Sequence, residues 1–314
     1  MRATIAIPCI VALLLRAYTR RSLTPLGLLS AGLSASVHAL HPSALPFTLL
    51  GTFFLLGTQA TKVKHDIKAT LTQSSSGSSG GEGPRTSVQV FANSGAATLL
   101  VLVHIYLYGL SPTATGTCFS SSSSIVPDLI LLGIMSNYAA TTSDTLSSEL
   151  GILSRSKPRL LTTLRTVPPG TNGGVSLAGL GAGVAGSTAI ALTSLLFLTF
   201  CKDSSLTRTD TFTLVTLLGT AGTLLDSLLG AILQASVVDR RTGKIVEAPG
   251  GGKVLTKPRP GPNSYQGDMK EKEGHESRMI NSGHDILDNN QINFLMAGIM
   301  SVSGMVAGQF LMRA

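Results

Sequence analysis

The sequence predicts an all-α fold, a polytopic helical membrane protein. Hydrophobic residues make up 43% of the 314 residues and charged residues only 13%, about half the charged fraction of an average soluble domain. The apolar residues fall in long continuous runs, which favours a bilayer as their surroundings and excludes the alternating pattern of a β-barrel. The whole chain, residues 1–314, is expected to form a single integral membrane domain.

Eight apolar runs predict about seven or eight transmembrane helices. The first run is short, but its arginines follow the apolar core, whereas in a signal peptide the basic residues precede it. His41-Pro42 forms the turn between the second and third runs, because proline ends one helix and helps to start the next. The predicted helices cover residues 5–15, 23–40, 45–60, 88–110, 125–141, 175–200, 212–238 and 292–312.

Two hydrophilic segments interrupt the apolar runs. Residues 72–84 are rich in Ser and Gly and are expected to form a flexible insertion. Residues 239–285 are expected to be a long mobile loop before the last helix. The cysteines, Cys9, Cys118 and Cys201, are too far apart to suggest a zinc site. Cys118 and Cys201 fall in loops on the same predicted side, so a disulfide between them stays open.

The basic residues predict an orientation. With alternating spans, 20 of the 24 Lys and Arg fall on one side, which the positive-inside rule assigns to the cytoplasm, with both termini opposite. The formal net charge of +8 suits anionic headgroups or phosphorylated ligands. No nucleic-acid partner is expected, because the basic residues are not interleaved with aromatic ones.

The first polar motif is Ser143-Asp144-Thr145-Leu146-Ser147-Ser148-Glu149-Leu150-Gly151. Asp144 and Ser148 would share a helix face, whereas Glu149 would lie about 140° away from Asp144. One carboxylate could then hold Mg²⁺ while the other orients an Arg or a hydroxyl, unless the helix breaks here. The structural alternative is an N-terminal capping box that uses Ser143 or Thr145.

The second motif runs from Arg165 to Ser176 and contains Pro-Pro-Gly-Thr-Asn-Gly-Gly. The turn at 170–174 is predicted to lead into the sixth helix, whose free N–H groups would bind phosphate, and Arg165 could add a bidentate contact. The structural alternative is a turn before a closely packed glycine-rich helix. That packing would involve Gly179, Gly181, Gly183 and Gly186.

Further polar residues converge on the predicted basic side. Asp226 lies inside the seventh apolar run, where an unpaired carboxylate is costly, so it should face a metal, an Arg or an amide within the bundle. Asn93, Asp288 and Asn289 lie near the ends of the fourth and eighth helices and are expected to complete the same pocket.

At these segments the chain resembles the transmembrane protein 19 family, which includes the plant phytyl-phosphate kinase. The resemblance is carried by residues 89–95, 143–151, 167–176, 222–230 and 287–290, and it extends over about residues 25–308. It implies an integral membrane protein and, in the plant member, a kinase that converts an isoprenoid monophosphate to its diphosphate. The expected location is the endoplasmic reticulum, with the basic loops and the active site on the cytoplasmic side. The acidic motif is also similar to that of CTP-using lipid kinases and cytidylyltransferases, so Mg²⁺ and CTP (or ATP) are the expected cofactors.

The resulting hypothesis assigns roles to named residues. Asp144, Glu149 and Arg165 are expected to be catalytic, and Asp144 and Asp226 to bind the metal. The residues expected to bind phosphate or substrate are Asn93, Ser148, Gly170, Thr171, Asn172, Gly173, Gly174, Asp288 and Asn289. The expected partners are membrane lipids and an isoprenoid monophosphate.

Two alternatives remain open. One is a non-catalytic membrane protein or transporter, which would place its polar cluster at the bilayer midplane. The other is a cytidylyltransferase acting on a lipid phosphate, whose product would keep the CMP group.

Overall fold

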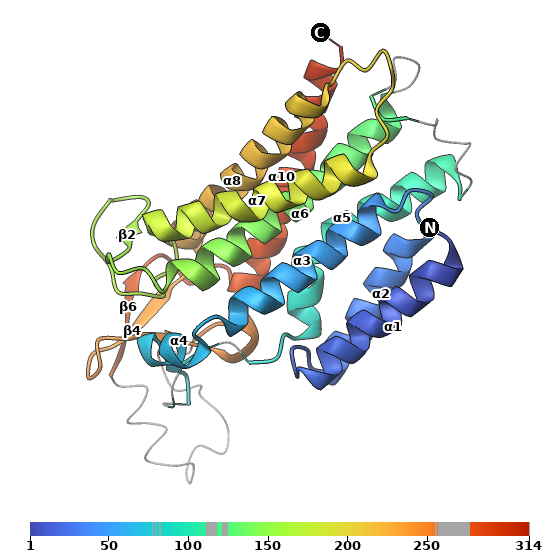
Figure 1. Ribbon diagram of the computed structural model, residues 1–314. Helices are drawn as coiled ribbons and strands as arrows, with labels where there is room; N and C mark the ends of the chain where they lie inside the picture. Colours follow the sequence, from blue (N-terminus) through green and yellow to red (C-terminus); the bar gives the residue numbers. More distant parts are fainter. Residues whose placement is uncertain are drawn as a thin grey trace.

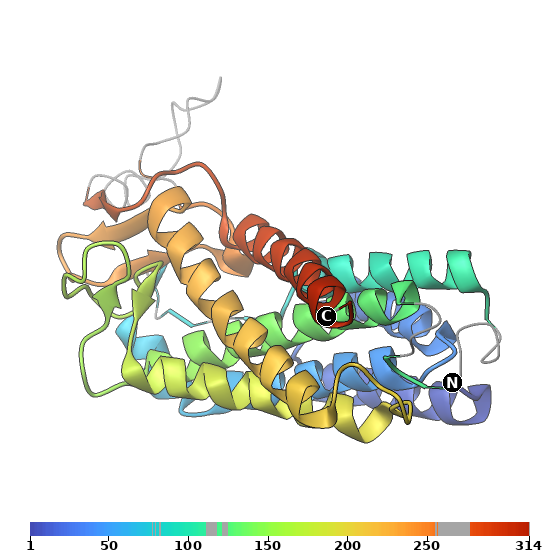
Figure 2. The same cartoon turned by 90° about the horizontal axis from the view of Figure 1, so that it is seen from above.

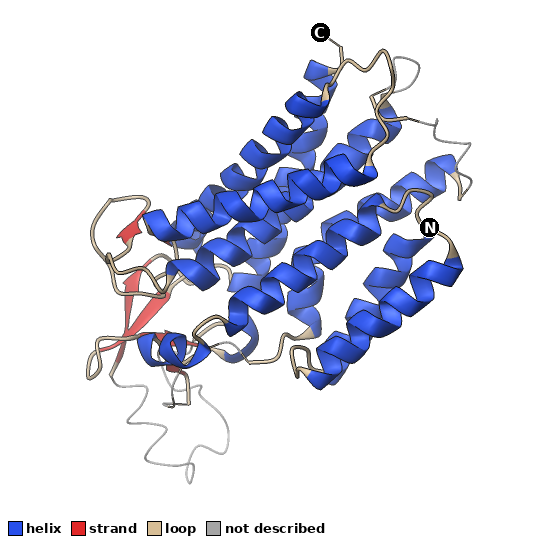
Figure 3. Ribbon diagram, viewed as in Figure 1, coloured by secondary structure: helices blue, strands red, loops and turns tan. Residues whose placement is uncertain are grey.

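The computed structural model forms a bundle of long helices with small strands gathered at one end (Figures 1 and 3). It describes residues 1–76, 78, 80–81, 83–110, 118–120, 125–254, 256 and 277–313. The end that carries the strands is called the strand end below. The opposite end, where Cys118 and Cys201 form a disulfide, is called the disulfide end. Figure 1 shows both chain termini at the disulfide end, which agrees with an even number of long helices.

The N-terminal helices form a hairpin followed by a third long helix. Helix α1 (Ala3–Thr19) packs on α2 (Pro25–Leu40), and α3 (Leu45–Lys62) follows after the turn at His41. Thr24 caps α2 by accepting a hydrogen bond from Gly27 N, with Pro25 in the first turn. A short helix, α4 (His65–Leu71), lies across the end of α3 and is absent from the sequence prediction.

Helix α6 (Val126–Gly151) is the centre of the bundle. It packs against α3, α5 (Ser87–Tyr108), α7 (Leu177–Phe197), α8 (Arg208–Leu233) and α10 (Asn289–Leu311). Figure 2 shows these helices surrounding α6 along its length. The sequence predicts that this helix ends at residue 141, but it continues to Gly151. Its residues up to Ser143 are buried by protein, and the polar residues beyond line a cavity instead of facing lipid.

Glycines allow α7 to approach α6 closely. A Cβ at Gly183 would lie 2.9 Å from Ser143 Oγ, and one at Gly186 would lie 3.0 Å from the Thr142 carbonyl. Gly179 makes the same close approach to Gly151, whereas nothing lies within 4 Å of a Cβ at Gly181. The expected glycine packing therefore holds at three of its four positions.

Short strands modify the all-α prediction. Strands β1 (Gln73–Ser74), β4 (Ser236–Asp239), β5 (Ile245–Glu247) and β6 (Arg278–Ser282) form a sheet in the order β1-β5-β4-β6. Strands β2 (Arg159–Leu160) and β3 (Gly174–Val175) form an antiparallel pair. The chain is thus mostly helical, with strands confined to the strand end.

This sheet is built from segments where the sequence predicts loops. The segment 239–285 contributes β5, the 3₁₀ turn Pro249–Gly251 and β6, and β1 begins the predicted insertion 72–84. Residues 255 and 257–276 of the first segment, and 77, 79 and 82 of the second, lie outside the described residues. Strand β1 pairs with β5, which lies more than 160 residues further along the chain, and local sequence carries little signal for such pairing.

The disulfide end is closed by Cys118–Cys201, which joins the loop before α6 to the loop before α8. Phe119 and Phe200 pair beside it as a backbone bridge and stack edge to face. The main apolar core extends from here along α6, where Leu132, Ile134 and Tyr138 are fully buried. The disulfide between Cys118 and Cys201, which the sequence left open, is therefore present in the structure.

Four helices meet the length and hydropathy of a membrane span: α5, α7, α8 and α10. Helices α1 and α2 are apolar but shorter. Helix α6 is not among the four, as expected for a helix whose polar side chains are buried against other helices. The described residues thus contain four candidate spans together with further apolar helices.

Candidate active site at the strand end

A polar cavity of about 420 Å³ opens at the strand end, between the ends of α5, α6, α8 and α10 and the loops that join them. Eleven of the residues predicted from the sequence as site residues line it. They are Asn93, Asp144, Ser148, Glu149, Gly170, Thr171, Asn172, Gly173, Gly174, Asp226 and Asn289. Arg165 and Asp288 do not line this cavity.

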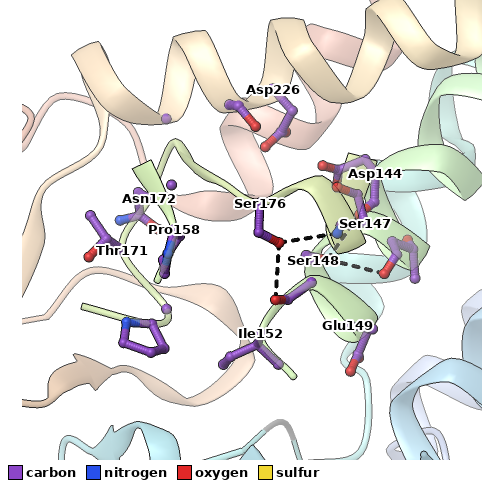
Figure 4. Close-up of a pocket in the computed structure, with 18 of the residues that line it drawn as sticks. Asp144, Ser147, Ser148, Glu149, Ile152, Pro158, Thr171, Asn172, Ser176 and Asp226 are labelled. Carbon is purple, nitrogen blue, oxygen red and sulfur yellow. Dashed lines mark hydrogen bonds between the residues drawn. The ribbon is translucent and has the colours of Figure 1, made fainter. Parts of the chain in front are cut away.

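Asp144 and Asp226 point into the same space from facing helices (Figure 4). Each lies seven residues, or about two turns, from the strand end of its helix, α6 or α8. With the Asn293 amide oriented to satisfy both neighbours, its Nδ2 donates to Asp226 Oδ2 and to the Asn289 carbonyl, each at 3.1 Å. An amide on α10 thus orients one of the two carboxylates, as expected for Asp226 from its place in an apolar run.

Asn93 adds a buried acceptor to this polar cluster. Its Nδ2 donates to the Gln89 carbonyl at 2.9 Å, while its Oδ1 is buried without a hydrogen-bond partner among the described residues. A buried, unpaired carbonyl oxygen is costly unless an ion or water satisfies it.

This donor set fits Mg²⁺. No group of three or more His, Cys, Asp or Glu side chains that could hold a metal occurs in the described residues. Mg²⁺ is bound by one or two carboxylates together with waters and substrate phosphates, so a dedicated protein cage is not required. Asp144, Asp226 and the amide oxygen of Asn93 are the residues of this cavity that would hold it.

Glu149 contacts a lysine and a hydroxyl group. Its Oε2 accepts from Lys68 Nζ at 2.5 Å, and its Oε1 accepts from Thr61 Oγ1 at 2.7 Å. Helix α6 does not break in the motif, so Glu149 lies on another face from Asp144 and joins α6 to α3 and α4. Of the two geometries considered for these carboxylates, the structure has the one in which Glu149 orients a hydroxyl.

The first motif is not an N-terminal cap. It occupies the last turns of α6, 17 or more residues after the helix begins at Val126. Ser148 Oγ donates to the carbonyls of Asp144 and Thr145 within the helix. The capping-box alternative is therefore wrong.

The second motif forms a turn anchored to the end of α8. Asn172 N donates to Ser236 Oγ at 2.9 Å, and Asn172 Nδ2 donates to the Ala235 carbonyl at 3.1 Å. Gly173 has φ of +74° and lies so close to α8 that a Cβ would be 2.4 Å from the Ser227 carbonyl. The structure thus gives this turn a fixed position at the cavity wall.

The sequence predicts that this turn leads directly into a helix with free N–H groups, and the structure differs. Strand β3 intervenes, and α7 begins after Ser176, whose Oγ accepts from Gly179 N at 3.1 Å and donates to the Gly151 carbonyl at 3.3 Å (Figure 4). The Thr171 side chain is also satisfied locally, because its Oγ1 donates to the Pro168 carbonyl at 2.7 Å.

The cations of the cavity differ from the predicted Arg165, which is exposed in the β2–β3 connection. Lys68, Arg85, Arg155 and Lys157 line the cavity instead. Arg85 Nη2 donates to Thr61 Oγ1 at 3.4 Å, and no carboxylate within 4.0 Å of Arg85 occurs in the described chain. Arg85 immediately precedes the N-cap residue of α5, Thr86. This position at the start of a helix is the local feature of the sequence that indicates Arg85 as a cavity residue.

Asp288 caps a helix. Its side chain accepts from Gln291 N at 2.9 Å, and Gln291 Oε1 accepts from Asp288 N, which completes a capping box at the start of α10. The next residue, Asn289, does line the cavity. Asp288 therefore supports the site by fixing the end of α10.

Glu247 on β5 is a cavity residue that the sequence did not indicate. Burial raises the pKa of its carboxyl above the usual value, against hydrogen bonds from Gly81 N and the Thr72 side chain that lower it. The nearby charge of Glu149 raises this pKa further. Glu247 reaches the cavity because β5 pairs with β1, which follows α4.

Comparison with known proteins identifies the family. Residues 8–301 match the model of the family described as integral membrane protein DUF92. The chain is 34% identical to Protein PGR of Arabidopsis thaliana over 301 residues, which cover 94% of this chain and 92% of that protein. No solved structure matches the chain.

Two further relatives match over shorter stretches. Uncharacterized membrane protein MJ0933 of Methanocaldococcus jannaschii is 44% identical over 108 residues, covering 33% of this chain and 40% of that protein. Protein VTE6, chloroplastic, of Arabidopsis thaliana is 35% identical over 141 residues, covering 45% of this chain and 37% of that protein. The family model covers nearly the whole chain and confirms the resemblance that five segments of the sequence indicate. This chain therefore belongs to the DUF92 family of integral membrane proteins.

Proposed function

We propose that this protein is an isoprenoid-phosphate kinase. It would transfer the terminal phosphoryl group of CTP or ATP to a phytyl- or polyprenyl-type monophosphate in the membrane. The observation that carries this proposal is the pair Asp144 and Asp226, which face one cavity from α6 and α8 with Arg85 and Lys68 in the same lining. Paired carboxylates beside cations match what phosphoryl transfer requires, namely positioning and neutralisation of charge.

In the proposed reaction, an oxygen of the lipid monophosphate attacks the terminal phosphorus of the nucleotide. The bond from that phosphorus to the bridging oxygen breaks, giving the lipid diphosphate and CDP or ADP. When bound, Mg²⁺ supplies neutralisation of the phosphate charges. Asp144, Asp226 and Asn93 are assigned to hold it, and Arg85, Lys68 and Arg155 to contact phosphate oxygens.

The role of the second motif is revised in this proposal. Arg165 does not line the cavity and is not assigned a phosphate contact. The turn at 170–174 is assigned to shape the nucleotide side of the cavity, with Asn172 holding it against α8. Glu149 is assigned to position Lys68.

The depth of the polar cluster supports an enzyme over a transporter. Asp144 and Asp226 lie about two turns from the helix ends, and Asn293 lies about one turn from the start of α10. A transporter site is expected near the bilayer midplane. A cavity that opens at one end is accessible to a soluble nucleotide and to a lipid headgroup at the same interface.

The orientation proposed is seven or eight spans with the strand end in the cytoplasm, in the endoplasmic reticulum. By the alternation of the predicted spans, the sequence assigns 20 of the 24 Lys and Arg to that side of the membrane, and this excess supports the orientation. The Cys118–Cys201 bridge at the opposite end is consistent with an oxidising lumen.

The test is product analysis. Protein purified into phosphatidylcholine nanodiscs would be given geranylgeranyl or phytyl phosphate, Mg²⁺, and CTP or ATP, and the lipids would be analysed by mass spectrometry. Formation of the diphosphate by the wild type and by the control Asp203→Ala, but not by Asp144→Ala or Asp226→Ala, is the expected result. Asp203 is exposed in the loop before α8, at the disulfide end.

Other outcomes separate the alternatives. A product that retains CMP would identify a cytidylyltransferase. No product with any pairing, or an undiminished rate in Asp144→Ala, would overturn the kinase proposal.

A further inference from the structure

A second cavity, of about 450 Å³, lies beside the first and is lined by basic residues. It is formed by the end of α1 and the turn after it, the end of α3, and the segment before α5. Its basic lining residues are Arg20, Arg21, Lys62, His65 and Arg85. The function proposed above leaves this cavity without a role.

The described lining of the cavity carries cations without a counter-charge. None of the described residues that line it is acidic. Within the described part of the chain, no carboxylate lies within 4.0 Å of the side-chain nitrogens of Arg20, Arg21 or Lys62, and His65 has only a contact of 3.8 Å with the exposed Asp66. Several cations that share a small space repel one another, so the arrangement favours binding of an anion.

The backbone holds Arg85 at the edge of this cavity. Arg85 N donates to the Ser22 carbonyl and Thr24 N donates to the Arg85 carbonyl, each at 3.0 Å, so the segment before α5 pairs with the α1–α2 turn. The side chain then extends past α3, where a Cβ at Gly57 would lie 3.2 Å from Arg85 Nη1. The α1–α2 turn therefore holds the backbone of Arg85, and the guanidinium lies against α3.

Arg85 also connects the two cavities. It lines both of them, as do Thr61, His65 and Gly81. An anion bound among Arg20, Arg21 and Lys62 would thus be adjacent to the cavity that contains Asp144 and Asp226, with Arg85 between them.

The elements that frame the basic cavity also expose apolar side chains. Leu15 and Tyr18 on α1 are 57% and 69% exposed, and Val63 and Ile67 beside α4 are 43% and 51% exposed. Cations next to apolar side chains at the end of a membrane helix match a lipid whose tail is in the bilayer and whose headgroup is anionic. A lipid tail would contact these apolar side chains, whereas a freely soluble anion would not.

We propose that this basic cavity is the docking site for the phosphomonoester headgroup of the lipid substrate. Arg20, Arg21 and Lys62 bind the phosphate where it leaves the bilayer, and Arg85 contacts it again at the entrance of the first cavity. The identity of the lipid rests on the proposed kinase function, whereas binding of a lipid phosphomonoester does not require catalysis.

Equilibrium binding without nucleotide tests this proposal. Radiolabelled geranylgeranyl phosphate would be bound to the full-length protein in phosphatidylcholine nanodiscs. The variant Arg20→Gln/Arg21→Gln/Lys62→Gln keeps polar side chains at three exposed positions and removes their charge. The matched control, Arg159→Gln/Arg240→Gln/Lys244→Gln, removes three exposed charges from the same end, outside both cavities.

The expected result is a loss of affinity of at least about tenfold in the first variant, because each cation near an anionic group contributes several-fold. The control variant should bind like the wild type, and the neutral alcohol geranylgeraniol should bind weakly to all three. Equal loss in the two variants, or equal binding of the alcohol and its phosphate, would overturn the proposal. Displacement by inorganic phosphate at concentrations similar to those of the lipid would also overturn it, because the site would then bind phosphate alone.

This experiment can fail independently of the kinase assay. If the protein binds geranylgeranyl phosphate through these residues but forms no diphosphate, the docking site is supported and the kinase proposal is overturned. Conversely, if the protein forms diphosphate and the first variant has an unchanged KM for the lipid, the kinase proposal is supported and the docking site is overturned.

Discussion

Lys68 and Glu149 form an ion pair that joins α4 to the last turn of α6, with Nζ 2.5 Å from Oε2. The two side chains are only 7% and 12% exposed. Lys68 Nζ also donates to the carbonyls of Ala60 and Thr61, at 3.0 and 2.8 Å. The pair therefore fixes a cation at the wall of the first cavity by contacts with the ends of both α3 and α6.

Removing one member of this pair should destabilise the protein strongly. Glu149→Gln leaves the buried Lys68 ammonium without its counter-charge, and breaking a buried pair in this way costs about 3–5 kcal/mol. The double variant Lys68→Met/Glu149→Gln should recover part of that loss, because it removes the unpaired charge. The thermal unfolding midpoint in detergent is the measurement, with the exposed Lys64→Gln as control. A midpoint for Glu149→Gln equal to that of the wild type would show that the pair does not stabilise the fold.

Asp226→Asn should change the dependence of the kinase rate on Mg²⁺. The substitution keeps the shape of the side chain next to Asn293 but removes one of the two charges that face the cavity. We expect kcat to fall on the order of 100-fold and the Mg²⁺ concentration for half-maximal rate to rise. Titration of the diphosphate-forming rate with Mg²⁺ measures both, with Asp203→Asn as control. A lower rate with an unchanged Mg²⁺ requirement would assign Asp226 to another role.

Much of the helical framework could be predicted from the apolar runs, because the helix ends carry strong local signals. Thr86, Thr207 and Asp288 each form a capping box at the start of a long helix. The end of α6 could not be predicted, because hydropathy recognises helices that contact lipid. This helix is covered by protein up to Ser143, and its last turns are polar. By hydropathy alone, these polar turns resemble a loop.

The site could be predicted only in part. Asp144 and Asp226 were recognisable because an acid in an apolar or low-charge segment is costly without a function. Arg85 and Glu247 were not, since they reach the cavity through pairing of distant segments: the bridge from Leu23 to Arg85, and β1 with β5. The position of Arg165 beside a motif predicts a phosphate contact, but Arg165 is exposed in the connection between β2 and β3.

Gly173→Ala should destabilise the protein, and Gly181→Ala should not. At Gly173 the backbone has φ of +74°, and a Cβ would lie 2.4 Å from the Ser227 carbonyl and 2.8 Å from Ala231 Cα. Positive φ and overpacking each cost about 1–3 kcal/mol. Gly181 is inside α7 with nothing within 4 Å of a Cβ, so it is a matched control. Unfolding midpoints that fall equally in the two variants would contradict the tight fit of the turn against α8.

Glu247→Gln should stabilise the protein at pH 8 but not at pH 4. Burial raises the pKa of this carboxyl in the folded protein, so the charged form is less stable there than in the unfolded chain. Below the unfolded pKa both states carry the proton and no penalty exists, whereas above the folded pKa the penalty is complete. Unfolding midpoints at pH 4, 6 and 8 measure the difference, with the fully exposed Asp66→Asn as control. A stabilisation that is independent of pH would show that packing and not charge is responsible.

Cys118 and Cys201 should resist alkylation until they are reduced. Maleimide labelling of the denatured, non-reduced protein should modify one thiol, Cys9, and labelling after reduction should modify three. Because the bridge spans 83 residues, replacing both cysteines by serine should lower the free energy of unfolding by about 4 kcal/mol.

The orientation can be tested by maleimide labelling as well. In sealed microsomes of a Cys9→Ser background, an impermeant maleimide should label Arg159→Cys at the strand end and not Asp203→Cys. Labelling of Asp203→Cys alone would place the candidate active site in the lumen and remove a cytoplasmic nucleotide as its donor.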